Sequence, residues 1–189
     1  MKINKFLFIF GIILLMLNLP GIFMTLRNSS IYDVTGNKSN DIITLNDVEV
    51  KQQIVRRANE SDEEYVFRIT KIIHEGIVNY WPDEGIEKYN LRVPIWENYL
   101  LYLASFIKPD IYRKYEYANY NKAIERGVGL CSQQALIVTG ILNDHGIDAE
   151  IIALNGHFVL RAQVTENTWY VVDPDYGVVI PHDIFEIEA

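Results

Sequence analysis

Cysteine is nearly absent from this chain of 189 residues, because Cys131 is the only one. A single thiol excludes an intrachain disulfide, and it excludes a zinc site built from several cysteines. The histidines stand at positions 74, 145, 157 and 182, which is not the spacing of metal ligands on one helix face. We therefore expect no structural metal and no cofactor.

Basic side chains are also scarce, since 17 Lys and Arg stand against 25 Asp and Glu, a formal net charge of -8. Residues 28–189 alone carry 14 basic and 25 acidic side chains, a net charge of -11. A domain this acidic is a poor candidate for binding nucleic acid or anionic lipid, and no basic stripe offsets the charge. The composition, with 49% hydrophobic and 12% aromatic residues, and the length suggest one globular domain plus an appendage.

Charge is missing altogether from residues 6–26, and no acid occurs before Asp33. A run of this length is about what is needed to cross a ~30 Å hydrocarbon core. Lys2 and Lys5 precede it and favour an N-terminus in the cytoplasm. Residues 1–27 are therefore predicted to be a signal anchor or a cleaved signal peptide, with a buried core helix as a third interpretation.

No small-residue cleavage motif follows the apolar run, which favours the uncleaved anchor. Residues 28–40 are polar and turn-forming, and a tether over residues 28–45 would join the N-terminal segment to a domain formed by residues 46–189. This domain would lie outside the cytoplasm, in a periplasmic or extracellular position, and it would be secreted if the segment is cleaved.

Two amphipathic helices are predicted in the first half of this domain. In residues 60–80, Ser61 is placed to cap, acids fill the first turn, and apolar side chains recur at helical spacing. Residues 94–107 show the same spacing, with Pro94 suited to the first turn.

The second half contains a third helix and then a change of period. Residues 126–131 read Arg-Gly-Val-Gly-Leu-Cys, and the two glycines mark a sharp turn before an almost wholly apolar helix over residues 132–142. Gly146 stands in the usual C-terminal cap position of this helix. The strands expected after it are residues 147–154, 157–164, 169–173 and 178–180, with Asn155-Gly156 as a hairpin turn. The predicted fold class is α+β: N-terminal helices, then an antiparallel sheet packed on the helix that carries the cysteine.

Three side chains on these elements form a candidate catalytic group. A thiol attacks a carbonyl carbon only as the thiolate, which a helix N-terminus and a neighbouring imidazole both favour. Cys131 opens the buried helix, where unpaired backbone N–H groups also offer donors for an oxyanion. His157, at the start of the second strand, is the candidate base, and Asp173, at the end of the third, is the candidate group that orients the imidazole.

Strand register sets a condition for this group. Side chains alternate between the two faces of a strand, so a two-residue turn at Glu166-Asn167 would put His157 and Asp173 on opposite faces. The two side chains can meet if the loop is wider, centred on Thr165, or if a bulge resets the register.

Four motifs in this order resemble the bacterial transglutaminase-like domain: G-x-C-x-x-x-A at 129–135, Gly-Ile-Asp-Ala at 146–149, Gly-His at 156–157 and Trp-Tyr-Val-Val-Asp-Pro at 169–174. The resemblance covers roughly residues 125–175. It implies a papain-like α+β core and a triad of Cys131, His157 and Asp173 that works through a thioester. In this chain the core would be preceded by the N-terminal transmembrane helix expected from the apolar run. In this family an upstream aromatic often completes the oxyanion hole, for which Trp96 is a loose match. Gln133 and Gln134 depart from the aromatic or charged residues often found after the cysteine, which leaves the substrate preference open.

The predicted function is an extracytoplasmic cysteine hydrolase or acyltransferase that acts on a peptide, an isopeptide or another amide. One alternative is a non-catalytic transglutaminase-like module that binds a partner in an envelope or polysaccharide-assembly system. Another is a structural membrane protein with an incidental thiol. The expected partners are an amide-bearing substrate and the membrane, through the N-terminal segment, but no nucleic acid. The oligomeric state and the choice between hydrolysis and transfer stay open.

Overall fold

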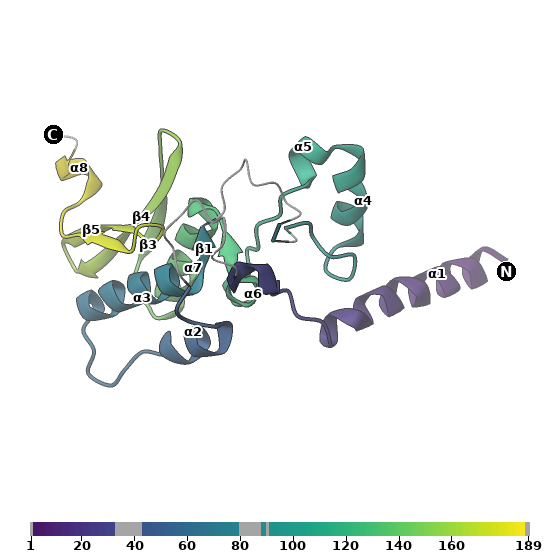
Figure 1. Cartoon of the computed structure of the whole chain (residues 1–189), viewed down its shortest axis with the longest axis horizontal. Helices are drawn as coiled ribbons and strands as arrows, with labels where there is room; N and C mark the ends of the chain where they lie inside the picture. Colours follow the sequence, from purple (N-terminus) through teal and green to yellow (C-terminus); the bar gives the residue numbers. More distant parts are fainter. Residues whose placement is uncertain (1, 33–42, 80–87, 90, 188–189) are drawn as a thin grey trace. The chain divides into compact units, whose positions relative to one another are not determined.

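Two units make up the chain in the computed structural model, which describes residues 2–32, 43–79, 88–89 and 91–187 (Figure 1). Unit 1 consists of Met1–Asn28 and Gly85–Tyr115, and unit 2 of Ser29–Glu84 and Glu116–Ala189. The segment limits expected from the sequence, 1–27, 28–45 and 46–189, stay a prediction.

Unit 1 begins with the apolar N-terminal segment, which forms helix α1 (Lys2–Asn18) and the short 3-10 helix η1 (Leu19–Ile22). The stretch Asn4–Gly21 is long and apolar enough to cross a membrane, and none of it is buried. This confirms an apolar N-terminal helix and makes a buried core helix an unsuitable interpretation. A signal sequence and an anchor both fit these properties.

The rest of unit 1 contains helices α4 (Tyr99–Ile107) and α5 (Pro109–Tyr112). The predicted start of the first of these at Pro94 is wrong. The carbonyl oxygen of Pro94 accepts hydrogen bonds from the N–H groups of Glu97 and Asn98, which makes a turn. Asn98 then caps the helix, because its side chain accepts a hydrogen bond from the N–H of Leu101 at 3.0 Å.

Unit 2 opens with η2 (Ser29–Tyr32) and with two helices that each carry a capping box: α2 (Asp47–Gln53) and α3 (Asp62–Gly76). The predicted cap at Ser61 is confirmed, since its hydroxyl accepts a hydrogen bond from the N–H of Glu64. The predicted continuation of this helix to residue 80 is wrong. Strand β1 (Val78–Asn79) follows instead and pairs in parallel with β2 (Val128–Gly129), because these buried backbone groups need partners. Tyr80 lies outside the described residues.

Helix α6 (Tyr120–Arg126), which the sequence analysis did not anticipate, leads to the helix that carries the cysteine. Gly127 ends α6 in the left-handed conformation, with a φ of 72°, and β2 follows. Helix α7 then runs over Cys131–Asp144, and Gly146 follows its end with a φ of 77°. The prediction of a buried helix that Gly146 terminates is confirmed, since Ile137, Val138, Ile141 and Leu142 are inaccessible to solvent.

The predicted strands form one antiparallel sheet in the order β3-β4-β5-β6. Their bounds are β3 Ala149–Leu154, β4 His157–Thr165, β5 Thr168–Asp173 and β6 Val178–Ile180. Leu154 pairs with His157 across Asn155-Gly156, which confirms the hairpin turn.

A β-bulge resets the register between β4 and β5. Thr165 pairs with Thr168 across a two-residue turn, but the register shifts between Gln163 and Thr165, and Leu160 then pairs with Val172. Asp173 consequently lies opposite Val159, two positions along β4 from His157 and on the same face of the sheet. Of the two alternatives drawn from the sequence, the bulge is the one that occurs.

Helices α3 and α7 both pack against the sheet. Helix α3 contacts β4 and β6, and helix α7 contacts β4 and β3. In Figure 1 the two helices lie beside the strands. The short helix α8 (Ile184–Ile187) adds Ile184 to a small apolar cluster with Val159 and Val171. Unit 2 is thus an α+β structure in which a four-stranded antiparallel sheet packs on the helix of Cys131, as expected.

Candidate active site

The imidazole of His157 is hydrogen-bonded to the carboxylate of Asp173. Nε2 of His157 lies 2.8 Å from Oδ2 of Asp173, and the two side chains are 27% and 17% exposed. The other carboxylate oxygen, Oδ1, accepts hydrogen bonds from the backbone N–H groups of Asp175 and Tyr176, at 3.1 and 3.3 Å. One oxygen therefore shapes the turn after β5, and the other fixes the imidazole.

The second ring nitrogen of His157 is left open by this arrangement. Among the residues that the structure describes, Nδ1 has no hydrogen-bond partner. The ring meets the ring of Tyr176 edge-on, with 5.8 Å between the centroids. An imidazole with one nitrogen held by a carboxylate and the other unengaged has the arrangement of a general base.

Cys131 occupies the first position of α7, and its side chain is half-buried. The residue before it, Leu130, makes no side-chain cap, and the first turn contains no acid. The N–H groups at this helix end are therefore not occupied by a side-chain cap, and they carry the partial positive charge of a helix N-terminus. The thiol makes no hydrogen bond with any described residue, so the structure does not join the sulfur to His157.

The next three side chains tie the start of α7 to two other segments: Ser132 and Gln133 bond to residues 116–117, and Gln134 bonds to Asp175. The hydroxyl of Ser132 donates to Oε1 of Glu116 at 2.6 Å. Gln133 is fully buried, and its amide pairs with the backbone of Tyr117: its oxygen accepts from the N–H at 2.6 Å, and its nitrogen donates to the carbonyl at 2.9 Å. These bonds hold the helix terminus, and hence the Cys131 backbone, in one position.

Gln134 makes the tie that matters most for the site, because it reaches the turn that follows Asp173. Its amide nitrogen donates to Oδ1 of Asp175 at 3.3 Å, and its buried amide oxygen has no hydrogen-bond partner among the residues that the structure describes. Nδ1 of His74, on α3, donates to the backbone carbonyl of Asp175 at 2.9 Å. Asp175 therefore joins α3, α7 and the end of β5, and it ties the first turn of the cysteine helix to the turn that follows Asp173.

Sequence reasoning did not identify Gln134, Asp175, His74 or Tyr176 as part of this arrangement. The one signal for them was the pair of adjacent glutamines on an otherwise apolar helix, since buried amides require polar partners. Their partners come from positions far away in the chain, which a pattern of spacing does not reveal. Trp96, the loose match for an oxyanion-hole aromatic, belongs to unit 1, whereas Cys131 belongs to unit 2.

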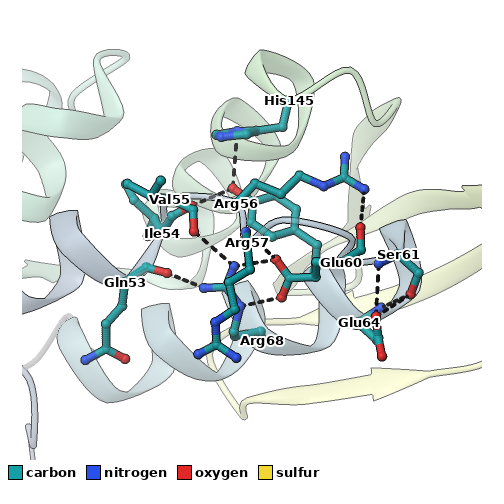
Figure 2. Close-up of polar contacts among 11 residues, drawn as sticks. Gln53, Ile54, Val55, Arg56, Arg57, Glu60, Ser61, Glu64, Arg68 and His145 are labelled. Carbon is teal, nitrogen blue, oxygen red and sulfur yellow. Dashed lines mark hydrogen bonds and ion pairs between the residues drawn. The ribbon is translucent and has the colours of Figure 1, made fainter.

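A pocket of about 850 Å³ lies along α3 and the loop before it, and Cys131, His157 and Asp173 do not line it. Figure 2 shows the polar contacts beside this pocket, in which Glu60 lies between Arg57 and Arg68. Nε of Arg68 donates to Oε1 of Glu60 at 2.6 Å, and this bond lowers the pKa of Glu60 to about 2. The pairing rigidifies the loop between α2 and α3.

Across residues 2–32, 43–79, 88–89 and 91–187, no group of three or more His, Cys, Asp or Glu side chains could hold a metal ion. The absence of a cofactor stays a prediction.

Comparison with known proteins adds no identification. No protein-family model matches the chain, and the comparisons with curated proteins and with solved structures find no match. The resemblance to the transglutaminase-like domain therefore rests on the motifs alone.

Proposed function

We propose that this protein is a cysteine hydrolase or acyltransferase of the transglutaminase-like type, with Cys131 as nucleophile, His157 as general base and Asp173 as the group that orients the base. The observation that carries the proposal is the 2.8 Å bond between Nε2 of His157 and Oδ2 of Asp173. It is supported by the bond from Gln134 to Asp175, which ties the first turn of the cysteine helix to the same turn.

The proposed reaction begins when the Cys131 thiol gives its proton to Nδ1 of His157. The thiolate attacks the carbonyl carbon of an amide, and uncapped N–H groups at the start of α7 stabilise the oxyanion. The C–N bond then breaks, the amine takes the proton from the imidazolium, and an acyl thioester on Cys131 remains. Water or a second amine attacks the thioester, which releases the acid or a new amide and restores the thiol.

Proton transfer to Nδ1 requires a rotation of the thiol or a closer approach of the sulfur, because no hydrogen bond joins the two groups. Catalytic hydrogen bonds are often long before substrate binds, so this geometry is compatible with the proposal. The same observation favours a second candidate function, a non-catalytic transglutaminase-like module that uses its surface to bind a partner.

The proposed location follows from α1. Because none of the apolar stretch Asn4–Gly21 is buried and the stretch follows Lys2, we propose that it is a signal anchor with the remainder of the chain outside the cytoplasm. The substrate would then be a peptide, an isopeptide or another amide of the cell envelope or its surroundings.

Mass spectrometry of the intact protein tests the catalytic proposal. Incubation with activated acyl donors, such as peptide thioesters, should add one acyl group to Cys131, and Cys131→Ala should remove the adduct with an unchanged melting temperature. His157→Ala should slow acylation by about 10²-fold or more. Acylation of the native protein no faster than that of a denatured control would favour the binding module.

A further inference from the structure

Helices α4 and α5 of unit 1 expose apolar side chains to solvent. Leu100, Leu103, Phe106, Ile107 and Ile111 are all between 55% and 79% exposed. Leu100, Leu103 and Ile107 recur at helical spacing, so they form one stripe on α4, and Ile111 lies on α5, which packs against α4. Exposed apolar patches of this kind mark surfaces that another apolar phase covers.

The opposite side of α4 is held firmly within its own unit. Ser105 is only 1% exposed, and its hydroxyl accepts a hydrogen bond from Nη1 of Arg92 at 2.7 Å and donates to the carbonyl of Tyr102 at 2.6 Å. On the exposed face itself, the guanidinium of Arg92 lies 4.2 Å from the ring centroid of Phe106. These contacts fix the orientation of α4, so the apolar stripe is a persistent surface feature.

Unit 1 also contains the apolar helix α1, and a close contact connects the two parts. The indole of Trp96 packs on Gly21, where an added Cβ would lie 2.6 Å from Cδ1 of Trp96. Gly21 ends the stretch Asn4–Gly21 that is suited to cross a membrane. Trp96 therefore packs where the apolar segment ends, which is the level of the bilayer interface if α1 is inserted.

The composition of residues 85–115 differs from that of the remaining chain. They contain five basic and three acidic side chains, whereas the other residues of 28–189 contain nine basic and 22 acidic ones. They also contain seven of the aromatic residues, of which five are tyrosines and one is Trp96. Tyrosine, tryptophan and basic side chains are enriched at the membrane–water interface. Residues 85–115 are thus weakly basic, although residues 28–189 as a whole are acidic.

From these observations we propose that the face of Leu100, Leu103, Phe106, Ile107 and Ile111 lies in the interface of the lipid bilayer that holds α1. The occupant of the face is lipid: its apolar side chains enter the boundary between headgroups and acyl chains, as in an interfacial amphipathic helix. The inference rests on the anchor part of the proposed function, and it is independent of the chemistry at Cys131. It would give the protein two points of membrane contact, a crossing helix and a surface helix pair.

Depth-dependent fluorescence quenching of the full chain in vesicles tests this. In a Cys131→Ala background, single cysteines replace Leu103, Leu15 on α1, or Val55, and each carries the same fluorophore. Val55 is the matched control, because it is apolar and 64% exposed but belongs to unit 2. The vesicles contain phosphatidylcholine and phosphatidylglycerol, with nitroxide-labelled lipids of shallow or deep label position.

The expected result is that shallow nitroxides quench the label at position 103 about twofold more than the label at position 55, and that deep nitroxides quench position 15. Quenching at 15 without quenching at 103 would overturn the surface proposal and leave the anchor intact. Quenching at 103 without quenching at 15 would support contact of the α4 face with the bilayer and would rule out α1 as the anchor. Equal quenching at 103 and 55 would also overturn the proposal. A label at 103 that neither lipid nitroxide nor aqueous iodide reaches would show that protein, such as a second copy of the chain, covers the face instead.

Discussion

His157 contacts Asp173 because a β-bulge separates both residues from the turn that joins their strands. Without the shift between Gln163 and Thr165, the two-residue turn would place the two side chains on opposite faces of the sheet. With it, Nε2 and Oδ2 lie 2.8 Å apart. A bulge at this place re-aims a side chain, which is the use that bulges commonly have next to functional sites.

Asp173→Asn should therefore impair the proposed chemistry without unfolding the protein. The amide can still bond to His157, but it removes the negative charge that stabilises the imidazolium and disturbs the choice of tautomer. Acylation of Cys131 should slow by about 10²- to 10⁴-fold, measured as the rate of adduct formation. Asp148→Asn, an exposed acid just before β3, is the control and should react like the native protein; an equal effect of both changes would contradict the role of Asp173.

Gln134→Leu should loosen the turn that carries Asp173. The change removes the 3.3 Å bond to Asp175 and retains the volume of the buried side chain. The free energy of unfolding should fall by about 1 kcal/mol, and Cys131 should be acylated more slowly. Gln163→Leu, which removes a bond to the carbonyl of Glu166 in an exposed hairpin, is the matched control. A loss of stability with an unchanged acylation rate would show that Gln134 only supports the fold.

Gly129→Ala should destabilise the entrance to α7. A Cβ at this position would lie 2.6 Å from Cβ of Gln133, an atom that cannot move without the helix. The expected loss is about 1–3 kcal/mol of unfolding free energy, measured by chemical denaturation. Gly146→Ala, which meets no atom within 4 Å but has a φ of 77°, provides the comparison with a purely conformational cost. An unchanged midpoint for Gly129→Ala would contradict the close approach.

Stability should depend on pH through Glu60. Its pKa is about 2 in the folded protein against a usual 4.5, with the hydrogen bond from Arg68 as the largest cause. Because the folded pKa is the lower one, the stabilisation is complete above about pH 4.5 and is lost as the pH falls toward 2. Glu60→Gln should cost about 1.5–3 kcal/mol at neutral pH, and the difference from the native protein should shrink on acidification. A difference that is constant between neutral pH and pH 2 would contradict the assignment.

Local signals in the sequence located most elements of unit 2. Ser61 followed by Glu64 defined the start of α3, and Asn155-Gly156 defined the hairpin, since both act through backbone bonds within a few residues. The end of α3 was not predictable in this way. Ile77 and Val78 continue the helical spacing, but a strand partner from residues 128–129 is available only in the folded chain.

The errors and omissions arise from competition between local signals or from distant contacts. Pro94 and Asn98 can both start a helix. In the structure Pro94 begins a turn, and Asn98 is the residue that caps α4. For the candidate site, the sequence indicated Cys131, His157 and Asp173 through their order on adjacent elements. It left their register open, and it gave no indication that Gln134 and His74 meet at Asp175, because those bonds depend on the packing of α3 against α7.

The most direct test of the account is the alkylation rate of Cys131 in the folded protein. The proposal requires that His157 and the start of α7 favour the thiolate, which is the reactive form. Iodoacetamide should label native Cys131 at neutral pH faster than the denatured chain, and His157→Ala should remove this advantage while the melting temperature is kept. Native labelling that is slower than that of the denatured chain and unaffected by His157→Ala would contradict the central claim.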